Sequence, residues 1–378
     1  MAHHNTILNQ IAALLPRHEF KALAKQHHRG TKFRKFNRWS QFMVMFIAQL
    51  SGRKSLRDVV MNVAAQSSKL YHLGIKKCSR ATLARVNEQQ PATLYEALFH
   101  KLLQQCRVLA PRHRFKFNGR VYLLDATVID LCLSVFPWAE FRKRKGAIKL
   151  HIGLDGDGYL PEFVNLTTGK KHEINWAKTL KLPTGSMAVF DMGFTDYKWY
   201  QTLMGNGIYF VTRLKSNAQI ERLEKRRGRK TKGVSVDRTI KLGNIAEPLR
   251  MVTYQDPETG KKLSFVTNAT HLDAKTIADL YKERWQIELF FKWIKGNLKI
   301  KTFLGTSRNA VLTQIWVALI VYLLLAFLKF KAKVGLSMQQ ILRLLQLNLF
   351  ERRNFIDLIK PPAPQLIEHR QFLLFQNL

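Results

Sequence analysis

Residues 121–129 read Val121-Tyr-Leu-Leu-Asp-Ala-Thr-Val-Ile129, an apolar and β-branched run that contains a single carboxylate, Asp125. This composition predicts a buried β-strand. An ionised side chain in a buried strand costs free energy unless it has a partner. Asp125 therefore either pairs with an arginine of the core or belongs to a functional site.

Further strands follow, and each is apolar or β-branched: Ala147–Leu154, Tyr159–Leu166, Met187–Asp191 and Gly207–Arg213. The first two flank Asp155-Gly-Asp-Gly158, whose acids are best explained as turn residues. A helical stretch, Tyr197–Met204, separates the last two. Three strands in a meander, then a helix and further strands, is the order of an RNase H-like core. We therefore predict an α/β (α+β) chain with a mixed sheet and flanking helices.

A β-rich insertion is predicted within this core, at about residues 216–266. It includes a basic run, Arg222–Lys232, with seven Lys or Arg among 11 residues. Such a run is either a solvated loop or a segment that follows phosphates. Strand-like stretches come next, at Gly233–Leu242, Leu249–Tyr254 and Leu263–Thr267. A helix from about Ala274 to Lys295 then returns the chain to the core.

Three regions are predicted from this order of elements: a helical N-terminal DNA-binding region at 1–112, the RNase H-like core at 113–330, and a helical C-terminal region at 331–378. In the first region, Ser55 and Ser79 are expected N-caps. The helix after Ser79 would present Arg80 and Arg85 outward. That arrangement suits either a helix-turn-helix recognition element or a plain helical hairpin.

The charge balance points to nucleic acid. Sixty-two Lys and Arg against 26 Asp and Glu give a formal charge of +36, which attracts polyanions. A ribosome-like or membrane-surface protein is the alternative. Three isolated cysteines, Cys78, Cys106 and Cys132, form neither a disulfide framework nor a metal motif, which indicates a reducing compartment.

One segment, Asn309–Leu328, has no charged residue over 20 positions and is long enough to span a membrane. Polar residues interrupt it, and basic residues flank both of its ends, so it shows no inside–outside bias. A helix buried in a large core explains it as well, and we favour that interpretation.

Two more carboxylates are candidates for a site. Asp191 closes the strand Met187–Asp191, although it could simply cap the next helix. On the helix Ile277–Lys295, the side chains of Tyr281, Arg284, Glu288 and Lys295 fall on one arc, beside an apolar stripe that would pack on the sheet. Phosphoryl transfer on DNA uses two divalent ions, for which carboxylates are natural ligands. An amphipathic helix with ordinary ion pairs is the alternative.

The spacing Tyr281-x2-Arg284-x3-Glu288-x6-Lys295 resembles the Y-R-E-K signature of insertion-sequence transposases in the family numbered four, which belong to the DDE class. The resemblance covers roughly residues 118–330. It includes these motifs: Asp125-Ala-Thr127, Lys149-Leu-His151, His172-Glu173 and Phe210-Val-Thr-Arg-Leu-Lys215. One motif departs from the family pattern, because Asp191-Met192-Gly193-Phe194 stands where Asp-Arg-Gly-Tyr is usual.

The resemblance implies that Asp125, Asp191 and Glu288 bind two Mg²⁺ (or Mn²⁺) ions. It also implies DNA contacts at Tyr281, Arg284 and Lys295 near the cleaved end, and at Arg213 and Lys215 along the backbone. Trp285 and Trp293 are candidates for stacking on a flipped base, and a core position is the alternative for either. His151, Arg80 and Arg85 are further expected DNA contacts. The expected partner is double-stranded DNA, both transposon ends and target, bound by a homodimer in the bacterial cytoplasm at the nucleoid and without a membrane. The altered Asp191 motif leaves a second hypothesis, a catalytically decayed DNA-binding protein or transposition repressor.

Overall fold

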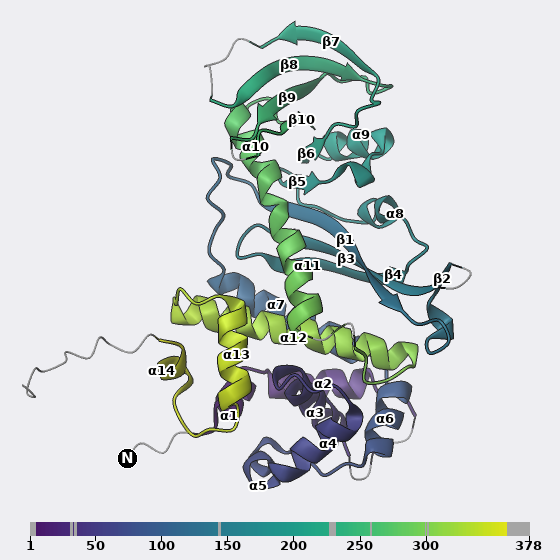
Figure 1. The fold of residues 1–378 in the computed structure, drawn as a ribbon, viewed down its shortest axis with the longest axis vertical. Coiled ribbons are helices and arrows are strands. Elements are labelled where there is room, and N and C mark those ends of the chain that lie inside the picture. Colours follow the sequence, from purple (N-terminus) through teal and green to yellow (C-terminus); the bar gives the residue numbers. More distant parts are fainter. Residues whose placement is uncertain are drawn as a thin grey trace, which may run out of the picture.

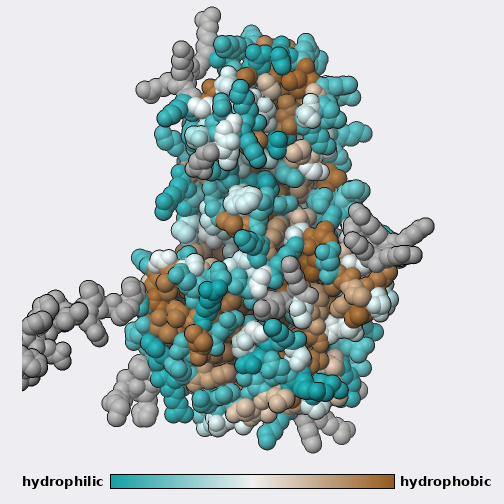
Figure 2. All heavy atoms as spheres, in the orientation of Figure 1, coloured by the Kyte–Doolittle hydropathy of each residue, from teal (hydrophilic) through white to brown (hydrophobic). Residues whose placement is uncertain are grey.

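The computed structural model describes residues 5–30, 33, 36–142, 145–226, 232–257, 259–298, 300 and 302–360. Figure 1 shows a sheet region at one end and a helical region at the other, joined by two consecutive helices that run down the sheet. Hydrophilic side chains cover most of this face, as Figure 2 shows, which fits a chain with a net charge of +36. Of the predicted C-terminal region, residues 361–378 lie outside the described residues.

The core sheet is built from five strands: β1 (Val121–Leu131), β3 (Lys145–Asp155), β4 (Leu160–Thr168), β5 (Met187–Phe190) and β6 (Tyr209–Arg213). β1, β3 and β4 form an antiparallel meander, while β5 is parallel to both β1 and β6. A short strand, β2 (Glu140–Arg142), also pairs with β3. The strand order β4-β3-β1-β5-β6 and the mixed directions confirm the predicted RNase H-like sheet.

Alternation along β1 places its side chains on two faces of the sheet. Tyr122 and Leu124 pack with α8 (Glu173–Ala177) and α9 (Tyr197–Gly205), whereas Leu123 belongs to the core on the other face. The helix α9 was predicted from the sequence, whereas the short helix α8 was not. Asp125 follows Leu124 and therefore lies on the same face as Leu123.

The insertion does not form a separate body, because its strands extend the same sheet. They are β7 (Ile220–Lys225), β8 (Val234–Leu242), β9 (Leu249–Gln255) and β10 (Lys262–Thr267). β10 pairs with β6, and β9, β8 and β7 follow in order. Three of these strands were predicted, but the charged and exposed strand β7 was not. Residues 227–231 of the basic run lie outside the described part of the chain.

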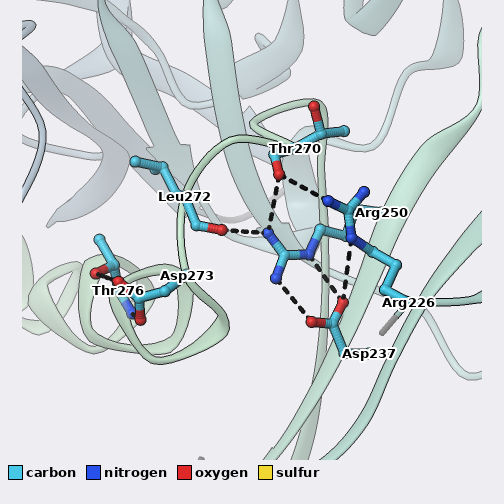
Figure 3. Close-up of polar contacts among 7 residues, drawn as sticks. All are labelled: Arg226, Asp237, Arg250, Thr270, Leu272, Asp273 and Thr276. Carbon is cyan, nitrogen blue, oxygen red and sulfur yellow. Dashed lines mark hydrogen bonds and ion pairs between the residues drawn. The ribbon is translucent and has the colours of Figure 1, made fainter. Parts of the chain in front are cut away.

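A buried arginine fastens the insertion to the start of the next helix (Figure 3). Arg250 is 4% exposed and donates two hydrogen bonds to the Asp237 carboxylate, at 2.8 and 2.7 Å. It also donates to the carbonyls of Thr270 and Leu272, directly before the N-cap Asp273. Burying a charge is affordable when it is fully paired, and here the pairing fixes β8 and β9 against the loop that precedes α10.

The predicted helix Ala274–Lys295 is two helices, α10 (Ala274–Glu283) and α11 (Trp285–Asn297), so the single-helix prediction is wrong. At the junction, the backbone N–H of Arg284 bonds to the carbonyl of Tyr281, three residues back. This tighter turn interrupts the regular i to i−4 pattern without any proline or glycine in the sequence. It also sets the direction in which Arg284 leaves the helix.

The described residues before β1 form seven α-helices: α1 (Ile7–Ala12), α2 (Arg17–Gln26), α3 (Arg38–Leu50), α4 (Leu56–Ala65), α5 (Ser67–Leu70), α6 (Arg80–Gln89) and α7 (Thr93–Leu109). The Ser55 and Ser79 side chains accept hydrogen bonds from the backbone N–H groups at 58 and 82, which confirms both predicted caps. Two helices close the described chain, α13 (Met338–Asn348) and α14 (Phe355–Ile359), and α13 contacts α3.

The long apolar segment forms α12 (Arg308–Ala332), which passes the length and hydropathy criteria for a membrane span. However, 89% of its most apolar window is buried inside the protein. It packs against α3, α6, α7 and α11. This confirms the core-helix interpretation of the segment, because its apolar side chains already contact other helices.

Candidate active site

The first two carboxylates are neighbours because of strand register. β1 and β5 run parallel, with Leu124 opposite Phe190. Asp125 and Asp191 follow at the next position on adjacent strands, which lie about 4.8 Å apart in any sheet. The Asp125 Oδ1 atom accepts a hydrogen bond from the Ala126 N–H at 2.7 Å, and Asp191 Oδ1 accepts one from the Gly193 N–H at 2.8 Å.

The third carboxylate reaches the same place from α11 through an arginine. Arg284 Nη2 donates to Glu288 Oε1 at 2.5 Å, and its Nη1 donates to Asp125 Oδ2 at 3.4 Å. The guanidinium is 16% exposed, and it also lies over the Tyr281 ring, 5.7 Å from the ring centroid. One cation thus bridges a strand carboxylate and a helix carboxylate.

The electrostatics of Asp125 show how crowded with negative charge this cluster is. The pKa of Asp125 is raised from 3.8 to about 7, chiefly by burial and also by the charges of Asp191 and Glu288, against the lowering effects of the Ala126 hydrogen bond and of Arg284. The pKa of Arg284 is raised despite burial, because Tyr281, Glu288 and Asp125 favour its charged form. The carboxylates of the cluster therefore outnumber the guanidinium that neutralises them, and binding of a further cation is favoured.

Tyr281 links this cluster to the end of β6. Its ring packs on Phe265, at 4.7 Å between centroids, and burial raises the pKa of its phenol. The charges of Arg284, Asp191 and Arg213 all act on that phenol. Arg213 is half-buried at the last position of β6, so it contributes a second guanidinium to the same side of the sheet.

Residues 116–324 match a family model described as a transposase DDE domain, which covers more than half of the chain. The chain belongs to the DDE transposases. These enzymes cleave DNA and transfer the cut strands, and membership implies dependence on a divalent metal. A second family model, described only as a domain of unknown function, matches residues 3–76 of the transposase.

Two relatives lie within the same class. The protein y4zB of Sinorhizobium fredii, named as a transposase, is 32% identical over 76% of this chain and 82% of its own length. A protein of Geobacillus stearothermophilus, named as the transposase of insertion sequence element IS5377, is 26% identical over 87% of this chain and 86% of its own. A solved piggyBac transposase synaptic complex with hairpin DNA is similar at a TM-score of 0.42 and 12% identity, covering 94% of this chain and 80% of that one.

The donor set of the transposase fits a hard divalent ion, because the cluster offers carboxylate oxygens from two rigid strands and a helix. Within the described ranges, no three His, Cys, Asp or Glu side chains already stand close enough together to form a metal cluster. The guanidinium of Arg284 donates to both Asp125 and Glu288. An ion bound by both carboxylates would compete with these hydrogen bonds.

Two sequence-predicted DNA contacts are already engaged by the protein. Lys295 donates to the Val128 carbonyl at 2.8 Å, beyond the point where β1 pairs with β5. His151 is fully buried on the opposite face of the sheet, next to Trp176 of α8. Burial and the charge of Lys149 lower the pKa of His151 to about 4. The structure does not bring His151 together with the carboxylates, because alternation along β3 points its ring to the other face of the sheet.

The other predicted contacts are accessible. Trp285 is 58% exposed at the first position of α11, and Lys215 is exposed just after β6. Arg80 and Arg85 are exposed on α6, in the helical region and away from the sheet. Lys149 and Glu173, which stand in two of the motifs of the resemblance, form an ion pair at 2.8 Å that joins β3 to α8. This pairing could not be predicted from the sequence. α8 in turn contacts the turn Met192–Phe194 that follows Asp191.

Proposed function

We propose that this transposase belongs to the family numbered four and acts on the inverted-repeat ends of its own insertion sequence. Asp125, Asp191 and Glu288 would hold two Mg²⁺ (or Mn²⁺) ions, and the enzyme would act as a homodimer on the bacterial nucleoid in the cytoplasm. The observation that carries the proposal has two parts: Asp125 and Asp191 follow paired positions of the adjacent strands β1 and β5, and Arg284 joins Asp125 to Glu288 of α11.

The bound ions would activate the attacking oxygen and stabilise the leaving oxygen of the phosphodiester. The protein residues position the DNA. Arg284, released from Asp125, would donate to a phosphate oxygen, because a guanidinium binds phosphate through a planar fork of donors. Tyr281 and Arg213 line the same side and would hold the neighbouring phosphate. Lys295 would fix α11 to β1 through its bond to Val128 while it faces the DNA.

A cleavage and joining assay tests this proposal. The purified transposase is incubated with a duplex that carries an element end, with Mg²⁺ or with a chelator. We expect nicking at the end and joined products with Mg²⁺, and neither with the chelator. The contrary outcome is a protein that binds the end but does not cleave it with Mg²⁺ or Mn²⁺. The altered second motif, with Met192 in place of the usual arginine, makes this outcome the one to test. That result would replace the enzyme with a decayed binding protein or repressor.

A further inference from the structure

A groove of about 2040 Å³ runs along α10 and reaches Arg284 and Trp285. We call it the α10 groove. Its other walls are the linker 109–116 between α7 and β1, the turn between β3 and β4, the insertion strands, and the C-terminal end of α12. Figure 1 shows the blue linker beside α10, between the insertion strands and α12. Pockets for small ligands occupy roughly 300–1,000 Å³, so this groove suits a macromolecule.

The charge of the lining selects an anionic occupant. Nine Lys or Arg and four Asp or Glu line the α10 groove. All four acids are engaged: Asp279 pairs with Lys275, and Glu283 accepts from the Tyr159 hydroxyl. Asp273 caps α10, and Asp256 accepts a hydrogen bond from the Thr259 N–H. The cations project from several walls, and the exposed ones include Arg112, Arg114 and Lys116 of the linker, Lys232 of the insertion and Lys333 after α12.

None of those five exposed cations forms a salt bridge with another part of the described chain. Like charges gathered around one groove repel one another, and this repulsion lowers the stability of the folded state. A polyanion between the walls removes that repulsion and releases its own counterions. The walls also carry rings, including Phe115 and Tyr254, which offer apolar contacts to sugars and bases.

We propose that the α10 groove binds the DNA arm that leads away from the bond held at the carboxylates, through its phosphates. This inference rests on the proposed function, because Arg284 lines the groove and also bridges two of the candidate catalytic carboxylates. The arm enters between the linker and the insertion strands and passes along α10 to the cluster. Contacts of this kind supply affinity and register rather than sequence recognition.

The test neutralises three cations of one wall and measures the salt dependence of DNA binding. The groove variant is Arg112→Gln/Arg114→Gln/Lys116→Gln. The matched control, Lys181→Gln/Lys198→Gln/Lys241→Gln, removes the same charge from exposed residues that do not line the groove. Binding of the full-length protein to a fluorescent 40-base-pair duplex is followed by anisotropy at several salt concentrations, with one duplex carrying an element end and another of scrambled sequence.

For B-DNA the slope of log K against log salt changes by about 0.9 for each phosphate contact, so the groove variant should lose about 2.7 of the wild-type slope. We expect this loss on both duplexes and an unchanged slope for the control. A groove variant that matches the control overturns the groove proposal while the transposase proposal stands. If the wild type binds neither duplex, the proposed function itself fails.

A cross-linking experiment gives an answer that does not depend on net charge. A photoreactive amino acid at position 114 should capture the duplex in the otherwise unchanged protein, and the same group at position 198 should not. Equal capture at both positions, or capture at 198 alone, contradicts the proposal. Both side chains are exposed, so neither replacement should disturb folding, and the melting temperature of each protein verifies this.

Discussion

Replacing Asp125 with asparagine should stabilise the metal-free transposase at pH 8. Asp125 is ionised at that pH, and its carboxylate is 18% exposed beside two other acids. Asparagine has nearly the same shape and carries no charge, and its amide oxygen can still accept the Ala126 N–H bond. The change therefore removes an unfavourable charge and retains most of the packing.

The magnitude follows from the pKa of Asp125, which is about 7 in the folded protein against an ordinary value of 3.8. Because the folded state holds this proton more tightly, the stability is fully present below the unfolded pKa and is lost as the pH rises through 7. A difference of about three pKa units corresponds to ~4 kcal/mol at pH 8, and to roughly half of that at pH 5.5. The pKa of about 7 already includes the attraction between Arg284 and the Asp125 carboxylate.

Urea unfolding of wild type and Asp125→Asn at pH 8 and pH 5.5, in the presence of a chelator, measures this difference. Asp130→Asn serves as the control, because Asp130 is an exposed carboxylate on the same strand. The control should change the free energy of unfolding by no more than about 0.5 kcal/mol at either pH. The reasoning is refuted if Asp125→Asn is no more stable than wild type at pH 8, or if its advantage does not shrink at pH 5.5.

Three further substitutions test, in turn, the competition between Arg284 and Mg²⁺, the buried Arg250–Asp237 pair, and the contact of Trp285 with DNA. Arg284→Gln removes the cation that bridges Asp125 and Glu288. Calorimetry without DNA should then show Mg²⁺ binding about fivefold tighter, because a salt bridge worth ~1 kcal/mol no longer competes with the ion. Weaker binding would contradict this. Arg250→Leu leaves Asp237 without its buried partner and should lower the free energy of unfolding by about 3 kcal/mol; a loss below 1 kcal/mol in chemical denaturation would argue against it. Trp285→Ala should leave stability within about 0.5 kcal/mol yet weaken binding of end DNA in anisotropy, because the ring is exposed. Unchanged affinity would remove Trp285 from the DNA surface.

The strands of the core could be predicted because β-branched runs and turn residues are local signals. The stretches around Asp125 and Asp191 are apolar runs with clear ends. The order of strands and helices along the chain was enough to indicate a mixed sheet. The register of β1 with β5 could not be predicted, because pairing between strands separated by more than fifty residues leaves no local pattern. That register is what brings the two aspartates together.

Periodicity placed Arg284 and Glu288 on one face of a helix, but it could not show the break between α10 and α11. The break occurs without proline or glycine, so only tertiary packing specifies it. The burial of His151 could not be predicted for a related reason. Its motif suggested a functional residue, whereas alternation along β3 and the undetected helix α8 bury it on the far face. The extension of the sheet through β10 was likewise a long-range pairing.

Metal-dependent cleavage by a Glu288→Gln variant tests the central claim most directly. Single-turnover nicking of an end duplex is measured with Mg²⁺ and with Mn²⁺, for wild type, for Glu288→Gln and for Glu247→Gln, which changes an exposed acid elsewhere. The three-carboxylate site predicts cleavage by wild type and Glu247→Gln and none by Glu288→Gln, with end binding retained by all three proteins. Cleavage by Glu288→Gln at the wild-type rate would contradict it.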